Sequence, residues 1–303
     1  MDDTGTERIW PALLGGRRLD DGVFAQAYAS ISPTRRALLK SCIASLYAMR
    51  PGTAVRDRQS VDGYGPAGSV LFRQAPLAWT LVVTDGAFAS PARLLAACLP
   101  ALCARIPHVA VLRAGAGSPW PLPLALALEL AGVEDVFDAP GLDATGSERE
   151  ALCADLRNRL GPGLVVDLGA KPFLSPGDAA QDVFRPGAGR GLGAYAPEGT
   201  HWDFETLAFA HPDRPIEVYG PGYDGRPGCA AMPGGFEDML AKGYEAVYAP
   251  APLAAKALRR VPLVLTPGRE AFWFWPGLVP ERFLDRRAAL FDANVSPEDP
   301  ERP

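Results

Sequence analysis

The sequence predicts an α/β protein with a doubly wound, Rossmann-like parallel sheet and a reduced second subdomain. Short, continuous apolar runs such as WTLVVT (79–84) and GLVVDL (163–168) are typical of strands that are buried on both faces of a sheet. These runs alternate with segments of helical periodicity. Such alternation indicates parallel strands joined by right-handed crossover helices.

The first predicted helix covers 32–49, with Ser32 as its N-cap and Pro33 at its first position, and it follows an irregular lead-in at residues 1–20. Ser147 and Glu150 form a predicted capping box at the start of a later helix. In this half of the chain the predicted strands are 69–74, 79–84, 109–114, a short one within 133–139, and 163–168, and the predicted helices between them are 90–106, 123–132 and 147–160.

Residues 175–215 are rich in glycine, proline and charge, and they predict a mostly irregular connection with a weak helix near 202–210. Strands and helices resume at 216. We therefore expect four regions: a helical lead-in at 1–60, a nucleotide-binding-type core at 61–174, the connection at 175–215, and α/β elements with an aromatic tail at 216–303.

Composition excludes several classes of protein. The 303 residues carry a net charge of −5 and no basic patch, which argues against binding to nucleic acid or to an anionic membrane. The acidic start, MDDTGTER, is unlike a signal peptide, and the longest apolar run (121–133) is too short to span a bilayer. We expect a cytoplasmic protein.

Cysteines and histidines give no sign of a disulfide framework or a metal site. Four of the five cysteines fall in predicted helices and none forms a CxxC pair, which suits reduced thiols. His108, His201 and His211 lack the spacing of metal ligands.

Several short motifs, in a consistent order from Pro76 to Trp275, resemble the aldehyde dehydrogenase superfamily. The matching segments are VAVLRAGAGSP, ATGSEREA, VVDLGAKPF and IEVYGP, with the helix LPLALALELAGVEDVFDAPG between the first two. The resemblance implies a dinucleotide-binding domain of that family. Histidinol dehydrogenase, whose architecture is related, is a weaker match because the three histidines would not supply its zinc-binding and proton-shuttling residues.

The resemblance also implies a binding site for NAD or NADP. Arg113 stands where the family has a lysine that contacts the adenosine ribose, whereas Ala116 replaces the nearby acid. Thr145, Gly146 and Ser147 match the family's pyrophosphate-facing segment, which would lie at a helix N-terminus. Glu217 and Tyr219 match the residues beside the nicotinamide ribose. Each of these features also has a purely structural interpretation. The segment after Arg113 fits a glycine-rich turn, Ser147 fits a simple N-cap, and Glu217 fits an acid at the end of a strand.

Most of the family's chemistry is missing from the chain. Asp167 takes the position of the general-base glutamate, but its side chain is one methylene shorter. No cysteine occurs in residues 168–216, where the nucleophile is expected, and Cys229 lies beyond Glu217. Ala87 replaces the oxyanion-hole asparagine. Conventional aldehyde oxidation is therefore not expected.

Two hypotheses remain. The chain is either a non-catalytic superfamily member that binds a nucleotide or assembles into homo-oligomers, or a cysteine-independent NAD(P)-dependent oxidoreductase that uses Asp167 or His201 as its base. In the family a β-hairpin arm mediates oligomers. Here the aromatic segment FWFWPGL (272–278) either supplies a comparable oligomer contact or packs within its own chain, and intrachain packing is the more common case.

Overall fold

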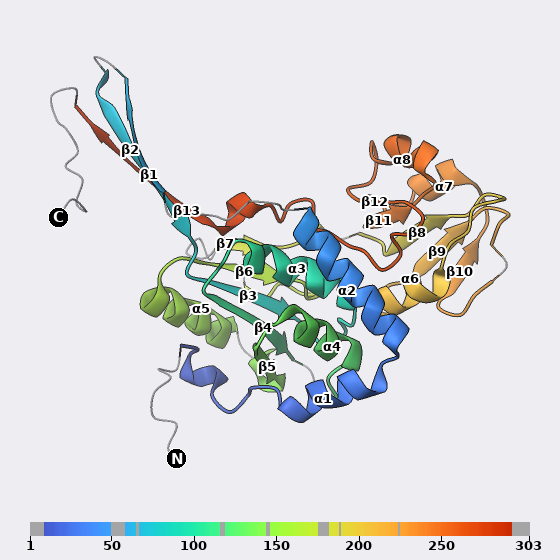
Figure 1. The fold of residues 1–303 in the computed structure, drawn as a ribbon, viewed down its shortest axis with the longest axis horizontal. Helices are drawn as coiled ribbons and strands as arrows, with labels where there is room; N and C mark the ends of the chain where they lie inside the picture. The colour runs from blue at the N-terminus through green and yellow to red at the C-terminus, as the bar shows by residue number, and fades with distance from the viewer. Residues whose placement is uncertain are drawn as a thin grey trace.

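The computed structural model describes residues 9–49, 58–64, 67–115, 119–143, 146–174, 182–187, 189–223 and 225–292. They form two α/β domains, each built on a five-stranded parallel sheet, and a three-stranded antiparallel arm (Figure 1). In the first half of the chain the helices are α1 (Asp21–Ser30), α2 (Pro33–Ala48), α3 (Pro91–Cys103), α4 (Leu122–Ala131) and α5 (Gly146–Leu160).

The first sheet has the strand order β5-β4-β3-β6-β7 and is parallel throughout. Its strands are β3 (Trp79–Thr84), β4 (His108–Ala114), β5 (Asp135–Ala139), β6 (Gly163–Asp167) and β7 (Asp182–Phe184). Every residue of β3 and β6 is buried, because helices cover both faces of the sheet. One face packs under α3 and α4, and the other under α5. The doubly wound, Rossmann-like sheet predicted from the sequence is confirmed.

A second parallel sheet follows, in the order β10-β9-β8-β11-β12. Its strands are β8 (Leu192–Tyr195), β9 (Ile216–Tyr219), β10 (Cys229–Met232), β11 (Ala246–Tyr248) and β12 (Val264–Leu265). When the strands of each sheet are numbered in the order of the chain, both sheets have the strand order 3-2-1-4-5. The second domain therefore repeats the topology of the first. Helix α6 (Phe204–Ala210) covers the face toward the first domain, and α7 (Phe236–Leu240) and α8 (Ala251–Ala257) belong to the other.

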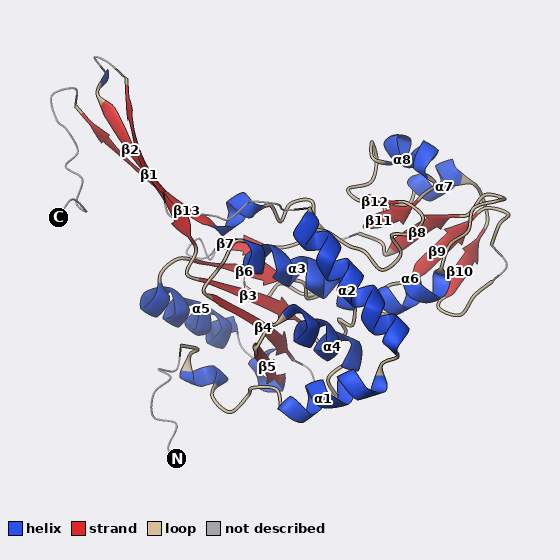
Figure 2. Cartoon of the chain, viewed as in Figure 1, coloured by secondary structure: helices blue, strands red, loops and turns tan. Residues whose placement is uncertain are grey.

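The arm consists of β1 (Arg58–Gly63), β2 (Ser69–Pro76) and β13 (Leu284–Phe291), with β2 in the middle. It projects from the body, and among the described residues no helix lies along it (Figure 2). Almost every residue of β1 is exposed. The sequence indicates the strand at 69–74 but not its place in an arm, because its partner in β13 lies more than 200 residues further along the chain.

Regular structure begins earlier in the second half than the sequence indicates. Strands β7 and β8 and helix α6 all lie within 175–215, the segment expected to be mostly irregular, although the weak helix near 202–210 corresponds to α6. Both strands are very short, three and four residues, and their neighbourhood is rich in glycine, so periodicity does not reveal them.

The aromatic segment is buried within its own chain, so of its two predicted roles the structure supports intrachain packing and corrects the oligomer contact. Trp273 and Trp275 are 1% and 4% exposed, and the indole N–H of Trp275 donates to the carbonyl of Arg93 at 3.2 Å. The two indoles pack edge to face, 5.3 Å apart. The segment therefore joins the two domains of one chain. Among the described residues, no helix combines the length and the apolar character that crossing a membrane requires.

Candidate functional site

Asp167, the predicted base, closes the loop that follows β6. Its side chain is 2% exposed and forms an ion pair with Arg185, which also donates to the carbonyls of Gly169 and Ala170 at 2.8 Å. The backbone N–H groups of Gly169 and Phe173 donate to its two carboxylate oxygens at 3.1 and 2.8 Å. Both oxygens are thus engaged, and a substrate water would have to displace one of these donors.

Asp85 completes the same arrangement from the end of β3, the neighbouring strand. Its carboxylate accepts from the backbone N–H groups of Ala87 and Phe88 at 3.0 Å and from that of Ala170 at 2.6 Å. Strands β3 and β6 flank the point where the order of the sheet reverses, which is where open α/β sheets bind ligands. Here Asp85 links the loop after β3 to the loop after β6 through its hydrogen bond with Ala170, and Asp167 stabilises the loop after β6. Asp85 was not singled out from the sequence, although it carries the same signal as Asp167, an acid that ends a buried strand.

A hydrogen-bonded chain of three buried side chains crosses the domain junction. Ser90, the N-cap of α3, lies 3.1 Å from Nδ1 of His211, and Nε2 of His211 lies 3.0 Å from the hydroxyl of Tyr248. The Ser90 hydroxyl donates to the carbonyl of Ala210 at 2.6 Å, so Nδ1 of His211 carries the proton and donates to Ser90. Nε2 then accepts from Tyr248. His211 is therefore not placed to activate Ser90 as a nucleophile.

A buried ion cluster lies beside this chain. Nη1 of Arg93 donates to both oxygens of Asp213 at 3.2 Å, and Nε of Arg93 lies 3.8 Å from Glu245. Arg214 pairs with the other oxygen of Glu245 at 3.2 Å. Burial lowers the pKa of Arg93 and raises that of Glu245. Ser90 and Arg93 come from the first domain and the other groups from the second, so the two networks fill the junction between the domains.

Arg113, expected to contact a cofactor ribose, is buried against its own sheet. Its guanidinium donates to both carboxylate oxygens of Asp138 at 3.0 and 2.8 Å and to the carbonyl of Pro119 at 3.1 Å. It also stacks 4.7 Å from the ring of Trp120. These contacts favour a structural role for the arginine.

The other predicted cofactor residues that the structure describes lie on elements other than that of Arg113. Thr145 and Ala116 lie outside the described residues. Helix α5 begins at Gly146, so Ser147 is its second residue and is exposed; the predicted N-cap position of Ser147 is wrong by two residues. Serine is tolerated there, and an N-cap assignment from sequence rests on the residue type alone.

Glu217 and Tyr219 lie in the second domain, on the face of its sheet that packs toward α7 and α8. The hydroxyl of Tyr244 donates to Glu217 and lies 2.8 Å from that of Tyr219. Burial and the neighbouring Glu217 raise the pKa of Tyr244. The structure therefore places Glu217 and Tyr219 in a different domain from Arg113 and Ser147.

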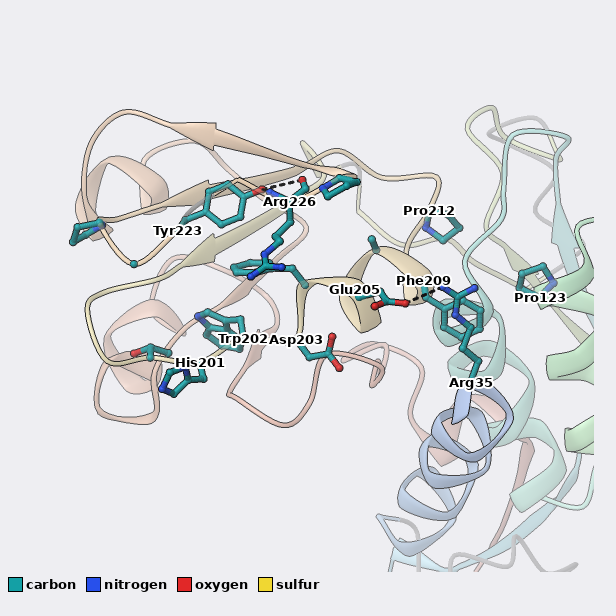
Figure 3. Close-up of a pocket in the computed structure, with 16 residues that line it drawn as sticks. Arg35, Pro123, His201, Trp202, Asp203, Glu205, Phe209, Pro212, Tyr223 and Arg226 are labelled. Atoms are coloured by element: carbon teal, nitrogen blue, oxygen red, sulfur yellow. Dashed lines mark hydrogen bonds and ion pairs between the residues drawn. The ribbon is translucent and has the colours of Figure 1, made fainter. Parts of the chain in front are cut away.

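His201 lines the largest cavity described, an open groove of about 1010 Å³ along α6, here called the α6 groove. Figure 3 shows His201, Trp202, Tyr223 and Arg226 on one side of the groove and Arg35 on the other. His201 is exposed. Sequence reasoning identified His201 but missed the aromatic walls around it, because Tyr223 comes from a different segment than Trp202, Phe204 and Phe209.

The remaining candidates add no reactive centre. Cys229 is half buried, and burial raises the pKa of its thiol, which disfavours the thiolate. Among the residues that the structure describes, no three histidine, cysteine or acidic side chains are grouped as metal ligands would be.

These features define a protein of two Rossmann-like α/β domains that carry an antiparallel arm. No family model matches the sequence, and neither does any curated protein. Among solved structures, histidinol dehydrogenase from Elizabethkingia anophelis matches with a TM-score of 0.50 and 9% identity, over 91% of this chain and 77% of that chain. The resemblance to the aldehyde dehydrogenase superfamily is thereby confirmed at the level of the fold, since the two architectures are related.

Aldehyde dehydrogenases are also found, at lower TM-scores. One from Brucella melitensis biovar abortus 2308 matches with a TM-score of 0.48 and 11% identity, over 91% of this chain and 83% of that chain. Betaine aldehyde dehydrogenase from Staphylococcus aureus, solved in complex with NAD+, matches with a TM-score of 0.45 and 11% identity, over 95% of this chain and 88% of that chain.

Proposed function

We propose that this chain is a non-catalytic assembly protein that keeps an aldehyde dehydrogenase-like fold and associates with copies of itself through its arm. The observation that carries the proposal is the arm itself: on one face of its three-stranded sheet Phe72 and Leu290 are 40% and 73% exposed. A small sheet that projects from the body with exposed apolar residues on one face is stabilised when a second surface covers that face.

One face of the arm is complementary to itself. The register places Arg58, Gln74 and Arg286 in one row near the body, and Asp62, Val70 and Leu290 in another toward the tip. Between these rows lie Ser60, Phe72 and Ala288. A two-fold axis through Phe72 would set the arginines of one copy against the aspartate of the other, with apolar side chains between them.

The state of Asp167, at the position that the resemblance implies for a general base, supports the same proposal. The carboxylate of Asp167 is held by Arg185 and by two backbone N–H groups, and no cysteine occurs in residues 168–216. Buried networks fill the junction between the domains. We expect no turnover with NAD+ or NADP+ and a panel of aldehydes, and measurable turnover would contradict the proposal.

Light scattering coupled to size exclusion tests the assembly. We expect a dimer or higher oligomer at micromolar concentration that Phe72→Asp and Leu290→Asp convert to monomer with an unchanged melting temperature. Val61→Asp is the matched control, since Val61 is also exposed but lies on the opposite face of the arm. A wild-type chain that is monomeric at every concentration would overturn the proposal.

A second candidate function is a cysteine-independent NAD(P)-dependent oxidoreductase, favoured by the exposed position of His201 on the α6 groove. Titration of NADH and NADPH by fluorescence tests its cofactor, and Arg113→Met, Ser147→Ala and Glu217→Gln test the residues that the resemblance implies. If the cofactor binds, either His201→Ala or Asp167→Asn should abolish turnover, depending on which residue is the base. Unchanged turnover would exclude these residues as the base.

A further inference from the structure

We propose that the α6 groove binds an acidic, proline-rich segment in the polyproline II conformation, and that the occupant is residues 297–303 of a second copy of this chain. The proposal rests on the proposed self-assembly and names an additional contact within it. It combines the chemistry of the groove, the sequence of the segment, and the place where the arm ends.

The walls of the groove carry aromatic rings in fixed positions. The indole N–H of Trp202 donates to the carbonyl of Tyr195 at 3.0 Å, which holds the ring against the loop after β8. Phe204 and Tyr223 pack edge to face with 4.9 Å between their ring centres. Phe209 lies further along the same groove (Figure 3). Pre-positioned aromatic rings along a groove are the surface that polyproline II ligands recognise, because proline rings pack between them.

Two arginines lie at separate places along the groove. The guanidinium of Arg35 lies 4.9 Å from the ring of Phe209 and 3.3 Å from Glu205, and Arg226 comes from the loop after β9 (Figure 3). The Arg35–Glu205 pair is weak, since the side chain of Glu205 is 85% exposed. Asp203 is occupied as the N-cap of α6, where it accepts from the N–H and the hydroxyl of Thr206. A carboxylate of the incoming segment can therefore replace Glu205 at Arg35 without burying an unpaired charge.

The sequence SPEDPERP supplies the matching ligand. Pro297, Pro300 and Pro303 recur at intervals of three residues, which is one turn of a polyproline II helix, so the three rings would lie along one edge. The residues between them are three acids and one arginine, a net charge of −2. The prolines also reduce the conformational entropy that binding would cost.

The position of the end of the arm indicates that residues 297–303 bind the α6 groove of a second copy and not that of their own chain. Strand β13 ends at Phe291 at the tip of the arm, and helix α6, which lines the groove, lies on the other side of the first domain from the arm (Figure 1). The eleven residues 293–303 span at most about 40 Å when fully extended. Returning along the eight residues of β13 would use about 27 Å of that length. The segment of the same copy would therefore extend only about 13 Å beyond the base of the arm, and the first domain lies between the arm and α6 (Figure 1).

A labelled peptide of sequence ANVSPEDPERP, titrated into the full-length chain and followed by fluorescence anisotropy, tests the proposal. We expect saturable binding that weakens at least tenfold when the three prolines of the peptide are replaced by alanine. Arg35→Ala and Arg226→Ala should each weaken binding about fivefold, and added salt should weaken it further. The matched control is Arg190→Ala, an exposed arginine outside the groove, which should leave the affinity unchanged.

Three results would overturn the proposal: no saturable binding at 1 mM peptide, equal affinity for the proline-free peptide, or an equal loss of affinity in Arg190→Ala. Circular dichroism of each variant establishes that it is folded. The two proposals fail separately. A chain that dimerises through its arm and ignores the peptide contradicts only the groove, whereas a wild-type chain that stays monomeric contradicts the proposed function whatever the peptide does.

Discussion

Asp167 and Arg185 form an ion pair in which the carboxylate is buried and the guanidinium remains partly exposed, with side-chain exposures of 2% and 31%. The arginine also holds the carbonyls of Gly169 and Ala170, so one side chain neutralises the buried charge and fixes the loop after β6. Arg185 thus occupies the hydrogen-bonding capacity that a working general base would offer to water.

Arg185→Met should destabilise the protein by roughly 2 kcal/mol, because it leaves the buried carboxylate of Asp167 without its cation. The figure lies below that for a fully buried pair because Arg185 itself is partly solvated. Urea denaturation measures the change. Arg190→Met is the control: its side chain is 60% exposed and 4.0 Å from Glu217, so the loss should stay within about 0.5 kcal/mol. Equal losses in the two variants would contradict the structural role of Arg185.

The first domain was predictable because its signals are local. Strands such as 79–84 and 163–168 are continuous apolar runs, and the helix at 32–49 has its cap, its proline and its apolar face within one segment. The arm was less predictable, since β13 pairs with a distant strand, and so was β8 in the second sheet, which has only four residues in a glycine-rich neighbourhood. The pairing of distant segments leaves no periodic signal in either one.

For the candidate site, the sequence predicts individual residues but not the partners that they contact. The sequence correctly places Asp167 at the end of a buried strand, but its partner Arg185 lies beyond a glycine- and proline-rich segment that separates the two. Likewise, His211 and Ser90 lie 121 residues apart, and only the packing of one domain on the other brings them together. Their buried network was therefore invisible in the sequence.

His211 should make stability fall in mild acid. Burial and the positive charges of Arg93 and Arg214 hold its pKa well below the ordinary value of 6.5. The unfolded chain therefore takes up a proton below pH 6.5 that the folded chain refuses, and the free energy of unfolding decreases as the pH falls. One such group costs about 2 kcal/mol at pH 5.0 relative to pH 7.5.

Urea denaturation at several pH values of His211→Gln and His201→Asn isolates this contribution. The raised pKa of Glu245 acts in the opposite sense, but it is common to all the chains compared. We expect His211→Gln, whatever its absolute stability, to lose the acid-dependent part of the decrease. His201→Asn, which replaces an exposed histidine, should retain it. Parallel pH profiles for wild type and His211→Gln would contradict the assignment.

Gly163→Ala should destabilise the first domain by about 1–3 kcal/mol through overpacking. A Cβ atom at this position would lie 2.1 Å from two ring atoms of Trp79, a fully buried side chain whose indole N–H donates to the carbonyl of Gly161. The ring would have to shift and strain that bond. Gly141→Ala is the control, since a Cβ there meets nothing within 4 Å. Denaturation midpoints and tryptophan fluorescence distinguish the variants, and equal midpoints would show that the Trp79 site tolerates the methyl group.

The buried cysteines should resist alkylation in the folded protein. Burial raises the pKa of Cys42 and of Cys98 to about 12, so at pH 8 only about one thiol in 10,000 is present as the reactive thiolate. Iodoacetamide followed by peptide mass spectrometry should leave both unmodified until the chain is unfolded in guanidinium, where all five cysteines react. Cys229, half buried with a raised pKa, should react more slowly than free cysteine. A thiol in the native chain that reacts faster than free cysteine would reveal an activated nucleophile and contradict the proposal that this protein performs no thiol-dependent aldehyde chemistry.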